Sequence, residues 1–138
     1  IYKSSVSIFI AEVLQNTLKE EEKNNELYDF LEATLLWCDL NEFDANFHLI
    51  FLLKMSKFLG ISPNPDTLHL HFFKYEKDNK QIYLLKELIG INFEALNTIK
   101  INGQKRHHML NEILSYFSVH LGYFKKPKSL KILHEIFN

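Results

Sequence analysis

Apolar residues recur at helical spacing along most of this 138-residue chain. Intervals of three and four residues predict a first helix over residues 5–18. Its buried face would be formed by Val6, Phe9, Ile10, Val13, Leu14 and Leu18. A second helix is expected to begin at Asn24 or Asn25, either of which suits an N-cap, and to run to about Cys38. The start of the chain is therefore predicted to be a pair of helices.

Residues 47–59 are apolar on nearly every side of the helix that they predict. The apolar positions are Phe47, Leu49, Ile50, Phe51, Leu52, Leu53, Met55, Phe58 and Leu59. A helix without a polar face is normally surrounded by other elements. We therefore expect this helix at the centre of the core, ending at Gly60, which tolerates the left-handed backbone of a helix end.

Shorter elements are predicted in the second half of the chain. Residues 69–75 alternate weakly and predict a short β-strand or an extended arm. Helices are predicted over residues 81–89, 92–99 and 104–121, with Asn92 and Asn102 as caps. Ser129 would cap a final helix that buries Leu130, Leu133, Ile136 and Phe137. The pattern predicts an all-α fold, a bundle of about six or seven helices in one domain.

The net charge of −1 conceals an uneven distribution along the chain. Residues 1–60 contain five cations and ten acids, whereas residues 61–138 contain eleven cations and seven acids. Between Lys100 and Lys131 there are seven cations and one acid, Glu112, so this stretch carries +6. Attraction between an acidic and a basic half of the fold is one explanation, and a binding surface for a polyanion is another.

Four of these cations lie within residues 122–131, which we call the lysine segment. They alternate with aromatic residues and a proline, which suits phosphate contacts with base stacking, or an acidic peptide with an apolar end. A solvated loop is the third interpretation. The candidate binding residues are Lys105, Arg106, Lys125, Lys126, Lys128 and Lys131, with Tyr123 and Phe124 as apolar contacts.

Catalytic and metal-binding patterns are weak in this sequence. The chain has seven histidines but a single cysteine, Cys38, so it lacks the paired thiolates of most structural zinc sites. We found no nucleophile with an adjacent base, no Gly-rich phosphate loop and no paired carboxylates in recognisable form. We therefore expect no enzyme, no metal and no cofactor. A metal-dependent nuclease or hydrolase would need ligands at His69, His71 or His107.

The cysteine count and the apolar runs also bear on the cellular compartment. Because Cys38 is the single cysteine, the chain can form no internal disulfide. No basic residue next to it in the sequence would activate its thiol, so we interpret Cys38 as a buried structural residue. No apolar run approaches the roughly 18 residues of a membrane span, and no signal peptide is evident. These features favour a cytoplasmic protein with no membrane partner.

Three parts of the sequence form a set in a definite order. They are residues 2–22, residues 45–64 with the turn Leu59-Gly60-Ile61-Ser62-Pro63-Asn64, and residues 116–130 with the step Lys128-Ser129. Together they resemble the C-terminal helical domain of the RecO family of bacterial recombination mediators. The first part is similar to the entry helices of that domain, the second to its central helix and Leu-Gly-x-x-Pro-Asn turn, and the third to its closing helix and Lys-Ser step. The resemblance thus covers nearly the whole chain.

The resemblance implies one RecO-like helical domain over residues 1–138, with the N-terminal OB-fold of the full protein outside this chain. It implies a non-enzymatic, nucleoid-associated protein of DNA repair and homologous recombination. Such a protein binds single-stranded DNA, a RecR-like partner and the C-terminal tail of single-strand-binding protein, and it promotes recombinase loading and strand annealing. The alternative is a helical scaffold that docks proteins without direct DNA contact.

Two departures from the family pattern limit what the resemblance implies. Many relatives carry a four-cysteine zinc ribbon after the Pro-Asn turn, whereas residues 66–71 contain no cysteine, so the chain resembles a zinc-less branch. The family receives the tail of single-strand-binding protein in an apolar pocket flanked by cations. Leu49 and Ile50 stand where basic relatives place arginines, so the resemblance assigns this pocket to no residues here.

Overall fold

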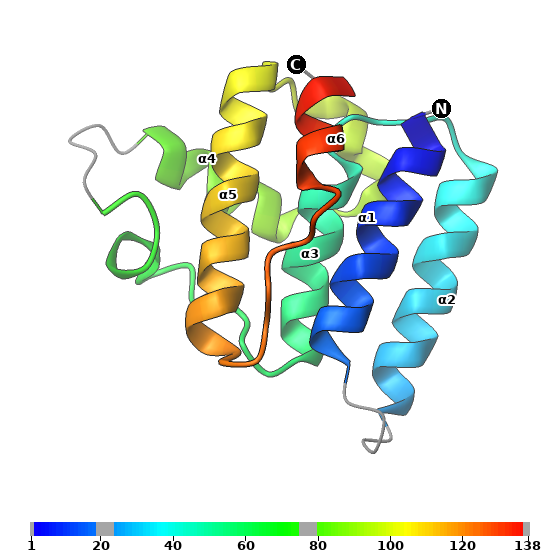
Figure 1. Ribbon diagram of the computed structural model, residues 1–138. Coiled ribbons are helices and arrows are strands. Elements are labelled where there is room, and N and C mark those ends of the chain that lie inside the picture. Colours follow the sequence, from blue (N-terminus) through cyan, green and yellow to red (C-terminus); the bar gives the residue numbers. More distant parts are fainter. Residues whose placement is uncertain (1, 19–23, 75–79, 137–138) are drawn as a thin grey trace.

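The computed structural model describes residues 2–18, 24–74 and 80–136, and these ranges form a helical bundle without β-strands (Figure 1). The all-α fold class is confirmed. The elements are α1 (Tyr2–Thr17), α2 (Asn25–Leu40), α3 (Phe47–Phe58), α4 (Lys80–Gly90), α5 (Gly103–His120) and α6 (Leu130–Ile136), with two 3-10 helices, η1 (Leu68–Leu70) and η2 (Phe93–Thr98).

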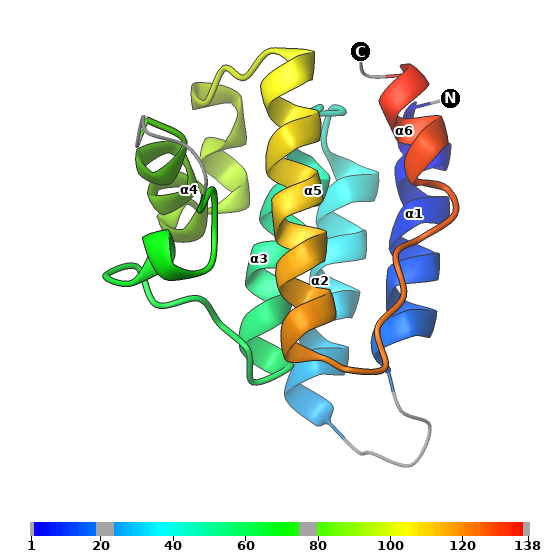
Figure 2. The ribbon, with the colours of Figure 1, turned by 60° about the vertical axis from the view of Figure 1, so that its left-hand side comes forward.

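Helix α3 occupies the centre of the bundle. It contacts α2, α4, α5 and η2, and every residue from 47 to 53 is buried. On the outer side, α6 packs against α1, so the two ends of the described chain lie close together (Figures 1 and 2). The prediction of a central helix surrounded by other elements is confirmed, because a helix without a polar face can bury all of its sides only there.

Three predicted helix ends are confirmed. The Asn24 side chain accepts a hydrogen bond from the Leu27 amide at 3.0 Å at the start of α2. The Asn102 side chain accepts one from the Lys105 amide at 2.8 Å at the start of α5. Each bond satisfies an amide that has no partner within its own helix. Gly60, just beyond α3, has φ of 75°, the left-handed conformation that glycine adopts without strain.

The strand or arm expected over residues 69–75 is wrong for the residues described there. The chain forms η1 and a turn instead, because its amides bond local carbonyls: the His71 and Phe72 amides both donate to Leu68 O, at 3.0 and 2.9 Å. Phe73 then adopts a positive φ of 52°. The helix expected over residues 92–99 is the 3-10 helix η2, and Asn92 makes no side-chain cap bond. Phe137, expected in the last helix, lies outside the described residues.

No helix in the described ranges has both the length and the apolar character needed to cross a membrane.

Candidate nucleic-acid interface

The lysine segment leaves the end of α5 and returns along α1 to the start of α6 (Figure 1, orange). Hydrogen bonds to α1 hold its backbone. The Tyr123 hydroxyl donates to Thr17 O at 3.1 Å, and the Asn16 side-chain amide donates to Lys125 O at 2.6 Å. The segment is therefore anchored along its course, although it contains no regular secondary structure before α6.

A third anchor joins Glu12 of α1 to the start of α6. The Glu12 carboxylate accepts hydrogen bonds from the Lys128 amide at 2.7 Å and from the Ser129 amide at 2.8 Å. These amides precede α6, where a negative charge also meets the positive end of the helix dipole. The expectation that the Ser129 side chain caps this helix is therefore wrong, because the capping carboxylate comes from α1.

The same contacts change the acidity of Glu12. The Ser129 side chain beside the carboxylate lowers the pKa of Glu12 most, although the hydroxyl has no hydrogen bond of satisfactory geometry. The two amides and the charge of Lys128 lower the pKa further, while desolvation opposes them. The net shift is downward, so the carboxylate holds the start of α6 in its charged form at neutral pH.

The four lysines of the lysine segment have exposed side chains. They are Lys125, Lys126, Lys128 and Lys131. Tyr123 beside them is 44% exposed while its hydroxyl is bonded to α1. Lys105 is also exposed, but it lies in the first turn of α5, about 22 Å along the helix axis from the end at which the lysine segment begins.

Two further candidate binding residues are buried and so lie off this surface as well. Arg106 is buried, and its guanidinium donates to Asn46 Oδ1 at 2.9 Å and to Ile101 O at 2.7 Å. Phe124 is also buried, with its ring 5.6 Å from that of Phe117. The sequence did contain a signal for Arg106, which precedes the buried Met109 by three residues and therefore shares its helix face. Both residues organise the interior rather than meet a ligand.

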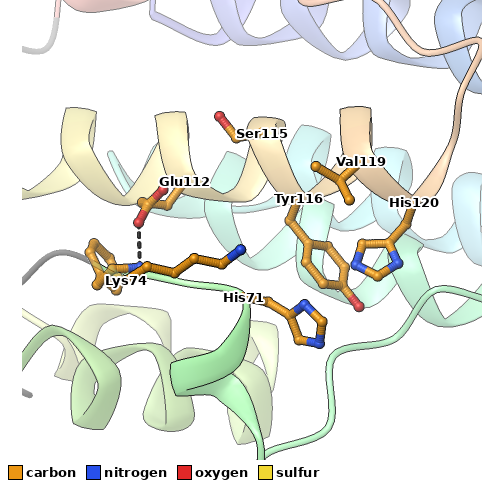
Figure 3. A pocket seen from close by; sticks show the side chains of 8 residues that line it. His71, Lys74, Glu112, Ser115, Tyr116, Val119 and His120 are labelled. Carbon is orange, nitrogen blue, oxygen red and sulfur yellow. Dashed lines mark hydrogen bonds between the residues drawn. The ribbon is translucent and has the colours of Figure 1, made fainter.

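A hollow on the other side of α5 was not singled out by the sequence (Figure 3). Its volume is about 260 Å³. It lies between the C-terminal half of α5 and the turn after η1, and it is lined by His71, Phe73, Lys74, Glu112, Ser115, Tyr116, Val119 and His120. The α5 residues among them follow the spacing of one helix face, but their partners come from the turn at residues 71–74, which periodicity could not assign to them.

Three rings meet at one end of this hollow. The Tyr116 and His120 rings are 4.1 Å apart between centroids, and the His71 ring approaches His120 edge-on at 5.2 Å. The Tyr116 hydroxyl donates to Ile61 O at 2.7 Å, which fixes that ring. Glu112 accepts a hydrogen bond from the Phe73 amide. The hollow thus combines ring surfaces with a carboxylate held in place by the backbone.

The histidines do not assemble the metal site considered from the sequence. Within the described ranges there is no group of three or more His, Cys, Asp or Glu residues that could hold a metal ion. His69 and His71 are exposed, and His107 stacks on His134 with ring centroids 4.1 Å apart. Cys38 is half-buried, and desolvation raises the pKa of its thiol, with the charge of Lys3 opposing this and that of Asp39 adding to it.

Known proteins similar to this chain share one name. The family described as "Recombination protein O C terminal" matches residues 1–67. The chain is 37% identical over its whole length to the DNA repair protein RecO of Flavobacterium psychrophilum, and covers 63% of that protein. The chain is thus similar to RecO proteins over nearly its whole length. Further RecO relatives occur in Christiangramia forsetii, with 36% identity over 98% of this chain, and Bacteroides fragilis, with 32% over 99%.

The chain spans about 63% of the length of these RecO relatives. Those proteins are DNA repair proteins by name. No solved structure matches the chain. This similarity extends over the lysine segment and the hollow, while the roles of their residues follow from geometry and charge.

Proposed function

We propose that this chain is a non-catalytic binding module of a DNA repair and recombination mediator, and that its lysine segment contacts the phosphates of single-stranded DNA. One observation carries the proposal: the four exposed lysines of the segment stand on a backbone that α1 holds by hydrogen bonds. The chain is also similar to relatives that are named DNA repair proteins.

The anchoring of the backbone favours binding over simple solvation. Bonds from Asn16 and to Glu12 order the segment before any ligand arrives. Binding then costs less conformational entropy than it would for a mobile loop. Lysine ammonium groups are point charges that meet phosphate oxygens without reading base sequence, so this contact suits a mediator that acts on any single strand.

Protein partners are part of the same proposal. As the RecO resemblance implies, the full protein would act with a RecR-like protein and with the acidic, Phe-ended tail of single-strand-binding protein to load recombinase and anneal strands. One surface that suits such a tail is a second hollow, of about 310 Å³, where Phe30, Trp37 and Phe93 lie near Lys54. Lys54 Nζ is 5.7 Å from the centre of the Phe93 ring, so an aromatic end and a carboxylate would both find a counterpart there.

The DNA contact is tested by replacing Lys125, Lys126, Lys128 and Lys131 with alanine in the full-length protein. Affinity for a labelled single-stranded oligonucleotide is measured by fluorescence anisotropy over a series of salt concentrations. For every lysine–phosphate ion pair that the substitutions remove, the slope of log K against log salt should become shallower by about 0.7. We therefore expect weaker binding and a slope shallower by up to about 3.

A matched control separates this effect from a change in overall charge. Two double variants are compared, and each removes two exposed cations. The first is Lys126→Ala with Lys128→Ala, in the lysine segment, and the second is Lys86→Ala with Lys100→Ala, outside it. The first pair should weaken DNA binding and the second should not. Unchanged affinity and salt slope in the quadruple variant would contradict the DNA contact.

The alternative functions give different results with the same quadruple variant. Loss of binding to an acidic, Phe-ended peptide with DNA binding retained would make the lysine segment a protein-docking surface. Normal strand annealing, DNA binding and partner binding would leave the helical domain as a scaffold with solvated lysines.

A further inference from the structure

We propose that the hollow between α5 and the turn at residues 71–74 is a subsite for one unpaired nucleobase of a single strand. The proposal rests on the proposed DNA-binding function and deepens it. The lysine segment supplies charge for the phosphates, and this hollow supplies ring surfaces and a hydrogen-bonding group for a base. The hollow is lined by α5 and the turn at residues 71–74, and the lysine segment leaves the C-terminal end of the same helix on its other side (Figure 2), so one strand passing that end would meet both.

The two histidine rings of the hollow are accessible. His71 and His120 have exposed side chains, whereas Tyr116 beside them is buried and is held by its bond to Ile61 O. Partial desolvation, with a further contribution from His71, lowers the pKa of His120 and so favours the neutral imidazole. A neutral ring provides a flat face for stacking on a base, as aromatic side chains do in other proteins that bind single strands.

The charges in the hollow favour a base over an acidic peptide or an isolated phosphate. Glu112 and Lys74 both line it, so the hollow has no excess of positive charge with which to hold either anion. The Glu112 oxygens accept hydrogen bonds, one of them from the Phe73 amide, and a carboxylate has lone pairs for more. The amino groups of adenine, cytosine and guanine are donors of the required kind. Lys74 runs along the opposite side with its ammonium toward the rings (Figure 3), where it can meet the phosphate of the same nucleotide.

The size of the hollow points to a single base. Its volume of about 260 Å³ lies below the range of roughly 300–1,000 Å³ that is usual for pockets of drug-sized ligands. It is open on one side, so a base can enter while the sugar and phosphate stay in solvent. Val119, 76% exposed at its edge, offers apolar contact to the ring that enters.

The test compares two strands of equal length, one with normal bases and one of abasic residues, in binding to the full-length protein and its variants. For His120→Ala, and for His71→Ala with His120→Ala, we expect binding of the normal strand to weaken about 5- to 10-fold, which is the lower end of the effect of removing one stacking ring. Binding of the abasic strand should stay unchanged, because the phosphate contacts remain. A 2-aminopurine base in the normal strand should be quenched by the parent protein and less by the variants.

His69→Ala is the matched control, since His69 is an exposed histidine of η1 outside the hollow. It should leave both strands and the 2-aminopurine signal unchanged. Glu112→Gln keeps an acceptor for the Phe73 amide but removes the charge, and should reduce any preference for oligo-dC over oligo-dT.

Two results would overturn the subsite. One is a ratio of affinities for normal and abasic strands that is the same in the parent protein and in the His120 variants. The other is an equal effect of His69→Ala. A negative result for the base subsite can be told apart from a negative result for DNA binding by the lysine segment. If the lysine variants weaken binding while the histidine variants do not, the strand contacts the lysine segment and the hollow takes no base.

Discussion

His48 is a fully buried imidazole on the central helix. Only 1% of its surface is exposed, and its ring meets the Phe9 ring edge-on with centroids 5.9 Å apart. Burial lowers the pKa of His48 from 6.5 to about 3, and the nearby charges of Arg106, His107 and His134 add to the effect. Burial also lowers the pKa values of His107 and His134. Folding therefore favours the neutral forms of His48, His107 and His134 at pH values at which the histidines of the unfolded chain would begin to bind protons.

The consequence is a loss of stability on acidification. His48 stays neutral in the folded state until about pH 3, whereas its unfolded form takes up a proton below pH 6.5. Its contribution to stability is complete above pH 6.5 and is lost as the pH falls towards 3. From His48 alone we expect the free energy of unfolding to fall by about 2 kcal/mol between pH 6.5 and pH 5.

Urea unfolding followed by circular dichroism at several pH values measures this fall. His48→Gln should flatten the pH dependence, even though it lowers stability at pH 7. An equally steep pH dependence in His48→Gln would contradict the assignment to this ring.

At the scale of elements, Glu12 connects α1 to α6 across almost the full length of the chain. The Glu12 carboxylate accepts a hydrogen bond from the Ser129 amide, and these two residues are 117 positions apart in the sequence. The helix that it caps, Leu130–Ile136, has seven residues and is too short to be stable without tertiary contacts. Packing on α1 and this capping contact together hold α6 and the lysine segment that precedes it.

Glu12→Gln is predicted to loosen this connection. It keeps the shape of the side chain but removes the charge and one of the two acceptor oxygens. We expect a loss of about 1–2 kcal/mol of stability and faster hydrogen exchange at the Lys128 and Ser129 amides. Because the pKa of Glu12 is lowered in the fold, the parent protein loses this stabilisation as the pH falls through that lowered value, and the difference from the variant should shrink there.

The matched control is Glu32→Gln, an exposed acid of α2. It should change neither the exchange of these two amides nor the stability by more than about 0.5 kcal/mol. Unaltered amide exchange in Glu12→Gln would show that packing on α1 alone holds α6.

At the scale of the whole molecule, α3 joins the other elements into one core. Its residues contact three other α-helices and η2, and buried aromatic rings extend the core on both sides, such as Phe9 in α1 and Phe117 in α5. A core shared in this way predicts that the described elements unfold together rather than one by one.

Leu52→Ala tests this unity. Leu52 is fully buried, so the truncation should lower the free energy of unfolding by about 3 kcal/mol. Circular dichroism and the fluorescence of Trp37, the single tryptophan, should report the same shifted midpoint. Leu40→Ala, at a site 74% exposed, should change stability by less than about 0.5 kcal/mol. Two separate transitions in the parent protein would contradict a single cooperative unit.

The sequence by itself determined the features that depend on neighbouring residues. Apolar spacing located the helices, the composition of residues 47–53 placed α3 at the centre, and local side chains marked the caps at Asn24 and Asn102. The strand expected near residue 70 failed because local carbonyls took its amides, a competition that weak alternation does not reveal.

Tertiary structure decided which faces meet. Periodicity shows that a helix has a buried face, but it does not say which distant residues cover that face, since many pairings bury the same apolar area. That is why the capping of α6 by Glu12, the burial of Arg106 against Asn46, and the meeting of His71 with His120 became visible only in the fold. The sequence placed four lysines side by side, and the contacts with α1 gave them an ordered backbone.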